Sequence, residues 1–194
     1  MQPETLYKTI RLEDKNYPSL LKQIYDPPSV LYVRGEIPLG IYFGVVGTRR
    51  MSEYGERATK KLVRELVQYG FVIVSGLAGG IDTIAHETTL AHGGKTVAIM
   101  GNGVNDSVIF PSQNRRLAQK IIQSGGAILS EFPPETKARP HHFPMRNRII
   151  SGMSRGILVV EAPQKSGALV TAQIALEQNR DVFAVPGSIF SEKS

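Results

Sequence analysis

The sequence contains no cysteine, and this absence excludes several kinds of structure and chemistry. Disulfide bonds and thiolate chemistry are impossible, which fits a reducing compartment. No apolar run approaches the length of about 20 residues that a membrane-spanning helix needs. The segment 1–13 also lacks the apolar core of a secretory signal peptide. We therefore expect a cytoplasmic protein with no membrane partner.

Familiar catalytic and cofactor motifs are missing or stand in the wrong structural context. The G-K-T triplet at 94–96 imitates the end of a P-loop, but it precedes a predicted strand instead of following one. Gly44 and Gly47 have the wrong spacing for a dinucleotide-binding fingerprint, and no acid follows the second strand. The G-x-S-x-G match at 152–156 leads from a helix into a strand, the reverse of a nucleophile elbow. We expect no catalytic residue and no cofactor.

Histidine forms no recognisable metal-binding motif. His86 and Glu87 begin like a zinc motif, but position 90 is leucine. His141 and His142 are adjacent, and no third ligand has a recognisable spacing. We expect no metal site.

Positive charge is concentrated in one part of the chain. The net charge is +6, and the stretch 136–160 contains basic residues but no acid. Such a concentrated patch points to a polyanionic partner more strongly than the total charge does. Its basic residues are Lys137, Arg139, Arg146, Arg148 and Arg155, with His141 and His142 beside them.

Apolar, β-rich runs alternate with helical patterns along most of the chain. This alternation, with nearly continuous apolar strands, predicts an α/β fold with a mostly parallel sheet and helices on both faces. Residues 1–40 are expected to be a short leader packed on the core, and residues 41–194 the core domain. The predicted strands are 30–33, 41–46, 71–74, 96–100, 127–129, 157–160 and 182–185, and the predicted helices are 17–23, 52–69, 82–92, 114–124, 145–153 and 167–178.

Four predicted strands are followed by polar, mostly glycine-rich loops, at 47–49, 75–82, 101–105 and 163–167. In a parallel sheet these loops lie together at the carboxyl edge, where ligands of open α/β sheets bind. Glycine lets backbone N–H groups approach a phosphate, and helix N-termini add partial positive charge. The pattern predicts a phosphorylated ligand.

The segment 143–148 combines an aromatic residue with two arginines. Phe143 could stack on an exposed base, or it could simply be a core residue, and the sequence leaves both open. Arg146 and Arg148 could hold phosphates, although Glu131 or Glu161 could reach one of them in space. We expect Arg49, Arg146 and Arg148 to share one groove, with single strands preferred over duplexes.

Several blocks occur in an order that resembles the DNA processing protein A (DprA, also called Smf) family. The combined set is specific and spans nearly the whole chain, whereas any one block would be weak. The blocks are VGTR at 46–49, SGLAGGID at 75–82, GNG at 101–103, SEFPP at 130–134, FPMRNRIISG at 143–152, VVEA at 159–162, SGALVTA at 166–172 and VFAVPG at 182–187.

The resemblance implies an extended Rossmann-like fold that binds single-stranded DNA. It further implies protection of incoming DNA in natural transformation, loading of the RecA recombinase, a homodimer, and no enzymatic activity. Carried over by position, the DNA site includes Gly47, Thr48, Arg49, Phe143, Arg146, Asn147 and Arg148. Further predicted DNA-binding residues, from the loops and the basic stretch, are Arg50, Ser75, Gly76, Gly79, Lys137, Ser166 and Gly167.

Three features depart from the family pattern, and one of them is the loop after Gly103, at 104–106, which looks slightly longer than usual. Members often carry a basic residue where this chain has Gly79, so one phosphate contact is expected to be missing. Members also normally continue beyond the position of Ser194, often to a winged-helix domain, so we expect a chain truncated at its C-terminus.

Two other functions stay open from the sequence alone. A related Rossmann-like (lysine-decarboxylase-like) group hydrolyses nucleoside monophosphates with a P-G-G-x-G-T loop and a glutamate beyond it. This chain has PQKSGA at 163–168 and Gln173 instead, which argues against hydrolysis. A nucleotide-sensing module is the other alternative, but one nucleotide would not need so long a basic stretch.

Overall fold

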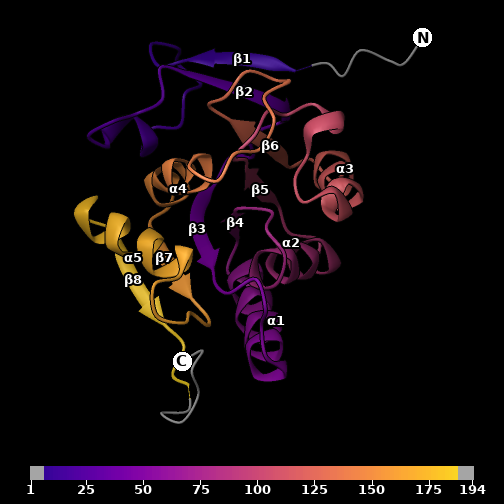
Figure 1. Ribbon diagram of the computed structural model, residues 1–194, viewed down its shortest axis with the longest axis vertical. Helices are drawn as coiled ribbons and strands as arrows, with labels where there is room; N and C mark the ends of the chain where they lie inside the picture. The colour runs from indigo at the N-terminus through magenta and orange to yellow at the C-terminus, as the bar shows by residue number, and fades with distance from the viewer. Residues whose placement is uncertain (1–6, 188–194) are drawn as a thin grey trace.

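One mixed sheet runs through residues 7–187, the part of the protein that the computed structural model describes. The outer limits of the predicted leader, at residue 1, and of the predicted core domain, at residue 194, lie outside the described residues. The strand order is β1-β2-β6-β5-β4-β3-β7-β8, as Figure 1 shows. The strands are β1 (Lys8–Arg11), β2 (Val30–Gly35), β3 (Ile41–Val46), β4 (Phe71–Ser75), β5 (Thr96–Ile99), β6 (Ala127–Ser130), β7 (Gly156–Val159) and β8 (Asp181–Ala184).

Strands β3 to β8 pair in parallel, and the leader strand β2 pairs antiparallel with β1 and β6. Five α-helices cover the sheet in the described residues, which confirms the predicted α/β class. They are α1 (Glu53–Gln68), α2 (Ile81–Ala91), α3 (Arg115–Gln123), α4 (His142–Met153) and α5 (Gly167–Glu177), and short 3-10 turns occur at η1 (Leu21–Gln23), η2 (Asp106–Val108) and η3 (Ser112–Asn114).

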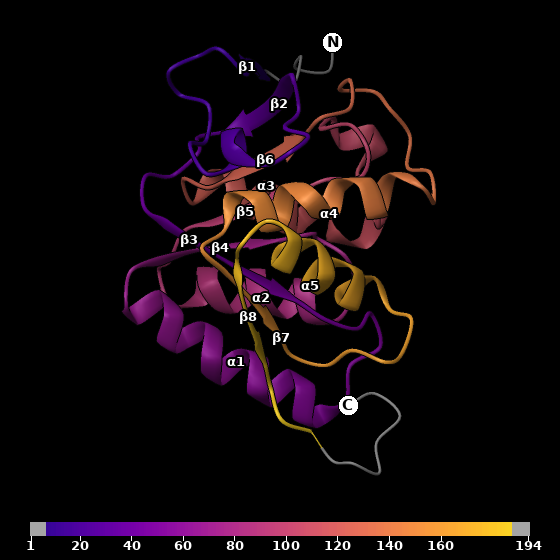
Figure 2. The same cartoon turned by 90° about the vertical axis from the view of Figure 1, so that its left-hand side faces the viewer.

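The helices lie on opposite faces of the sheet. Helices α1, α2 and α3 cover one face, and α4 and α5 cover the other, where they lie side by side (Figures 1 and 2). Consecutive residues of β3 show this arrangement, because Val45 packs in the cluster that contains Val63 of α1, whereas Val46 packs in the cluster that contains Ile150 of α4. Burial on both faces explains why the strands read as continuous apolar runs.

Local sequence explains where the helices begin and end. Ser52 caps α1, as predicted, by accepting a hydrogen bond from the backbone N–H of Gly55 at 3.1 Å. Gly70 follows α1 with φ +80°, a conformation that glycine adopts without strain. Ser166 caps α5 in the same way, through the backbone N–H of Leu169.

Three elements differ from the sequence prediction. The strand β1 was not predicted, and the predicted helix 17–23 is only the 3-10 turn η1. Helix α4 begins at His142, earlier than the predicted 145, so Phe143 lies inside its first turn. Proline at position 144 is compatible with this start, because a first-turn proline loses no intrahelical hydrogen bond.

The order in which successive strands are added to the sheet reverses at β3. Strands β4, β5 and β6 follow on one side of β3, whereas β7 and β8 lie on its other side. The carboxyl ends of β3 and β7 therefore form a topological switch point, which is the place where open α/β sheets leave a crevice for a ligand.

Candidate nucleic-acid interface

A groove of about 950 Å³ opens at this switch point. We call it the carboxyl-edge groove. Residues from five segments line it: 46–50 after β3, Ala78 and Asp82 around the start of α2, Phe110 before α3, 138–150 in α4 and the loop before it, and 163–171 after β7. The groove lies at the carboxyl edge of the sheet, where the sequence predicts a ligand site.

The loop after β3 is held rigidly from both sides. The backbone N–H of Thr48 donates to the carbonyl of Glu161 at 2.7 Å, and the carbonyl of Thr48 accepts from the N–H of Ile81 at 3.2 Å. Gly80, with φ +76°, allows this approach, since a Cβ there would lie 2.3 Å from the carbonyl oxygen of Thr48. With its backbone fixed, the loop presents Arg49 to solvent.

Phe143 lies at the side of the groove next to Arg49. The guanidinium carbon of Arg49 is 5.4 Å from the Phe143 ring centroid, within cation–π range. The ring also packs against Phe110, with centroids 5.9 Å apart, and against Gly101, where a Cβ would lie 2.8 Å from the ring. Phe143 is therefore half-buried: it contributes to packing and also lines the groove, so both interpretations left open by the sequence retain support.

Arg146 is not the free phosphate ligand that the sequence predicts. Its side chain reaches the floor of the groove, but the residue is only 4% exposed, and Nη1 donates to the carbonyls of Gly76, at 2.7 Å, and of Ile99. These two carbonyls lie at the ends of β4 and β5, so Arg146 joins α4 to two strands of the sheet.

Asp82 binds N–H groups of the same loop, which follows β4. Its Oδ2 accepts hydrogen bonds from the N–H groups of Gly76, at 3.1 Å, and Ala78, at 3.3 Å. Burial raises the pKa of Asp82, and the charge of Arg146 opposes that rise. Burial likewise lowers the pKa of Arg146 to about 10, with Asp82 opposing. The two buried charges hold the loop that follows β4.

Ser75 and Gly76, two further predicted DNA-binding residues, belong to this buried framework, and neither lines the groove. Ser75 is fully buried and donates to the carbonyl of Val45 at 2.7 Å. Gly76 is covered by Arg146, whose Nη2 would lie 2.5 Å from a Cβ at that position. The physical reason is that Ser75 is the last residue of the central strand β4 and Gly76 follows it directly, beneath the loop surface.

The expectation that Arg148 shares the groove is also wrong. Its guanidinium makes two hydrogen bonds of 2.7 Å to the carboxylate of Glu131, and its Nε also donates to the carbonyl, at 3.1 Å, and the carboxylate, at 3.2 Å, of Asp26. Helical residues two apart in sequence do not face the same side, so a groove-facing Arg146 directs Arg148 elsewhere.

The remaining predicted residues divide between the groove and its surroundings. Asn147 lines the groove, and its Nδ2 donates to the carbonyl of Gly167 at 3.2 Å, which fixes α4 to the start of α5. Gly79 and Lys137 are at least partly exposed next to the groove but are not among its lining residues. Groove-lining residues from the prediction are Gly47, Thr48, Arg49, Arg50, Phe143, Arg146, Asn147, Ser166 and Gly167.

The sequence prediction missed Arg139 as a site residue. It is exposed and lines the groove together with Arg49 and Arg50, so these three cations face the cavity. Asp82 is the one acid among the groove-lining residues, and it is buried and engaged. Arg139 lies in the acid-free stretch 136–160, and this position could have indicated it as a site residue. The groove is therefore suited to an anion that offers several charges along its length.

Within residues 7–187, no cluster of histidine, aspartate and glutamate could hold a metal ion, and no helix is long and apolar enough to cross a bilayer. Gln173, at the position discussed for a hydrolase, is exposed on α5 and donates to Glu177 at 3.0 Å.

The buried framework predicts a pH dependence of stability. His86 is fully buried on α2, with Nδ1 2.7 Å from Oγ1 of Thr96. Burial, aided by the charge of Arg146, lowers the pKa of His86 to about 3. An unfolded chain protonates this histidine below about pH 6.5, whereas the folded protein does not until about pH 3, so stability falls as pH falls through this window. Between about pH 7 and about pH 5, protonation of His86 in the unfolded chain should by itself lower the free energy of unfolding by about 2 kcal/mol.

Urea denaturation at a series of pH values measures this effect. His86→Gln cannot titrate, so its free energy of unfolding should lose this component of the pH slope, whatever its absolute stability. The same slope in both proteins would contradict the assignment to His86.

Comparison with known proteins gives a consistent result. The family described as DNA recombination-mediator protein A matches residues 8–194. The DNA processing protein DprA of Bacillus subtilis (strain 168) is 48% identical over 185 residues, covering 94% of this chain and 61% of that protein. That of Streptococcus pneumoniae (strain ATCC BAA-255 / R6) is 43% identical over 185 residues, covering 94% and 64%. The chain thus spans less than two thirds of the length of these relatives.

Solved structures agree with the sequence matches. The X-ray structure of DNA processing protein A from Streptococcus pneumoniae has a TM-score of 0.88 at 41% identity, covering 96% of this chain and 65% of that one. DNA processing protein A from Helicobacter pylori, described in terms of a unique single-stranded DNA binding mode, has a TM-score of 0.85 at 31% identity, covering 98% and 85%.

Proposed function

This chain belongs to the DNA recombination-mediator protein A family, and on that premise we propose that it binds single-stranded DNA in the carboxyl-edge groove. The observation that carries the proposal is the set of exposed arginines, Arg49, Arg50 and Arg139, around a half-buried aromatic ring. Arginines neutralise successive phosphates, and an aromatic ring at the wall can stack on a base. The Helicobacter pylori relative, described as binding single-stranded DNA, supports the same ligand class.

The backbone around the groove suits this ligand. The N-terminus of α5 opens at the groove, where no atom beyond its own chain neighbours and helix backbone lies within 4 Å of the position that a Cβ on Gly167 would occupy. A strand phosphate could therefore approach the N–H groups of the first turn of α5, where the helix dipole is positive. No step of bond making or breaking is needed, and we propose a binding protein without catalytic turnover.

The biological setting extends this proposal. We propose that the bound strand is protected and passed to the RecA recombinase in the cytoplasm during DNA uptake, and that the protein acts as a homodimer. The support is the family description as a recombination mediator, together with the similarity to DNA processing proteins.

Titration with matched single-stranded and duplex oligonucleotides tests the central claim. We expect clearly tighter binding of the single strand, because the groove offers a ring for stacking and no element for reading a duplex groove. If Arg49, Arg50 and Arg139 each contact one phosphate, the affinity should fall with salt at a log–log slope of about −2. Equal affinity for both forms, or an affinity that does not respond to salt, would contradict the proposal.

A further inference from the structure

A second acid-free basic segment borders the groove. Between Asp106 and Glu131 the chain contains Arg115, Arg116 and Lys120 but no acidic residue. Both flanking acids are already engaged, Asp106 with Arg34 and Glu131 with Arg148. The positive charge of this segment is therefore not neutralised from within it.

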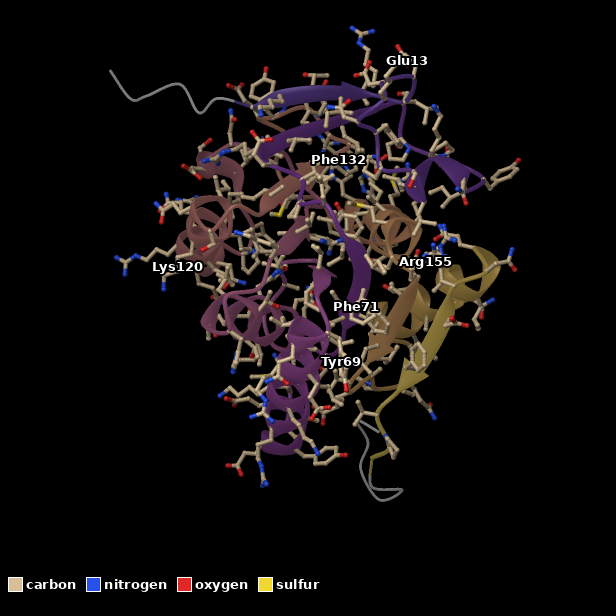
Figure 3. All side chains as sticks on the ribbon, turned by 180° about the vertical axis from the view of Figure 1, so that it is seen from behind. Glu13, Tyr69, Phe71, Lys120, Phe132 and Arg155 are labelled. Atoms are coloured by element: carbon tan, nitrogen blue, oxygen red, sulfur yellow. The ribbon has the colours of Figure 1, made fainter. Side chains whose placement is uncertain are left out.

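Helix α3 presents this charge on one exposed face. Arg116 and Lys120 are one turn apart and lie on the same side of the helix. Lys120 is seen at the edge of the molecule in Figure 3. The buried residues Leu117, Ala118 and Ile121 hold the opposite side of α3 against the sheet. We call the exposed set the α3 face; its members are Arg115, Arg116, Gln119, Lys120 and Gln123.

Neighbouring elements leave the charge of the α3 face largely intact. Helix α2, which packs beside α3, carries one exposed acid, Glu87. Strands β5 and β6 beneath α3 contain no acid, and Lys95 donates from its Nζ to the carbonyl of Ser124 at the end of the helix. No salt bridge of the described residues involves the three basic side chains of the α3 face.

The α3 face is continuous with the groove. Phe110 lines the groove, and the chain passes from it through η3 directly into α3. Asn114, the residue before α3, donates from Nδ2 to the carbonyl of Leu77 at 2.9 Å and to that of Ala78 at 3.4 Å. Ala78 is itself a groove-lining residue. The start of α3 is thus fixed to the wall of the groove.

We propose that the α3 face continues the DNA path, so that a single strand leaving the carboxyl-edge groove past Phe110 runs along α3. This inference rests on the proposed function. Charge complementarity selects a polyanion, and continuity with the groove identifies it as the same strand. Gln119 and Gln123 are also exposed, and their side-chain amides add hydrogen-bonding groups that can bind a strand of any base sequence. A strand long enough to reach α3 gains contacts that a short strand does not make.

Binding of oligothymidylates of two lengths, about 6 and about 20 nucleotides, tests the path. In the wild type, the log–log salt slope for the long strand should be more negative than that for the short strand by about 2, since three extra phosphates are neutralised. The triple variant Arg115→Ala, Arg116→Ala, Lys120→Ala should lose this difference and bind the long strand on the order of tenfold more weakly. Its affinity for the short strand should stay within about twofold.

A matched control removes the same charge elsewhere. The triple variant Arg57→Ala, Lys61→Ala, Arg64→Ala changes three exposed basic residues on α1, far from Phe110 in the sequence, where Glu53 and Glu65 also occur. It should keep the length dependence. If both triple variants weaken the long strand equally, net charge alone is responsible and the path is wrong. If the α3 variant keeps the length dependence, the path is wrong while the proposed function stands. If the wild type binds neither strand, the proposed function itself fails.

Discussion

Replacing Arg146 with alanine is expected to lower the free energy of unfolding by about 3–5 kcal/mol. The substitution removes the donor to two buried carbonyls, those of Gly76 and Ile99, and it leaves the buried charge of Asp82 without its cation. Unsatisfied buried acceptors cost about 1–3 kcal/mol each, and whole domains have only about 5–15 kcal/mol. Thermal or urea denaturation measures the loss directly.

Arg139→Ala is the matched control, because Arg139 also lines the groove but is exposed. It should leave the free energy of unfolding within about 0.5 kcal/mol of the wild type. The DNA affinity of Arg146→Ala, measured at a temperature where this variant is folded, should keep the wild-type salt slope. The reason is that the guanidinium of Arg146 in the wild type donates to two carbonyls and does not contact a phosphate. A stable Arg146→Ala protein with a reduced salt slope would restore Arg146 as a phosphate ligand and contradict the structural role.

Replacing Arg49 with alanine is expected to weaken single-strand binding by about 1–3 kcal/mol, roughly 5- to 150-fold. Arg49 is exposed at the groove, and its backbone is fixed by the hydrogen bonds of Thr48. Loss of one phosphate contact should also make the log–log salt slope less negative by about 0.7. The melting temperature should hardly change, since no buried group is exposed.

Two further variants make the Arg49 result specific. Arg148→Ala should keep the wild-type salt slope, because its partners are Glu131 and Asp26 and it does not line the groove. Phe143→Leu keeps an apolar side chain against Gly101 but removes the aromatic ring, so affinity should fall without a change of salt slope. Equal slopes for Arg49→Ala and Arg148→Ala would show that the loop after β3 is not a phosphate contact.

The sequence predicts the α/β fold and the carboxyl edge of the sheet as the place of the groove, because both follow from local patterns. Apolar runs with polar, glycine-rich loops after them are local signals, and the loops after β3 and β7 do line the groove. Strand β1 escaped prediction since Lys8–Arg11 has only one buried residue, Ile10, and its pairing with β2 is antiparallel at the sheet edge.

The roles of the individual arginines could not be read in the same way. Arg146 finds its partners at the ends of two strands that precede it by many residues, and no local pattern encodes that distance. Arg148 was partly predictable, because a spacing of two in a helix already separates it from Arg146, and Glu131 was among its possible partners. Basic residues without sequence-local acids are therefore candidates for a binding site, and tertiary structure decides which of them are free.

The pairing of β3 with β7 has a consequence for the synthesis of the protein. Phe43 lies opposite Gly156, so the two strands whose ends form the groove are roughly 110 residues apart, and a ribosome needs roughly 6–20 s to travel between them. For most of that interval the loop that carries Arg49 has been made but α4 has not, and the start of α5 follows β7 in the chain. A nascent chain therefore lacks the carboxyl-edge groove until β7 and the residues after it, which supply part of the lining, have been added.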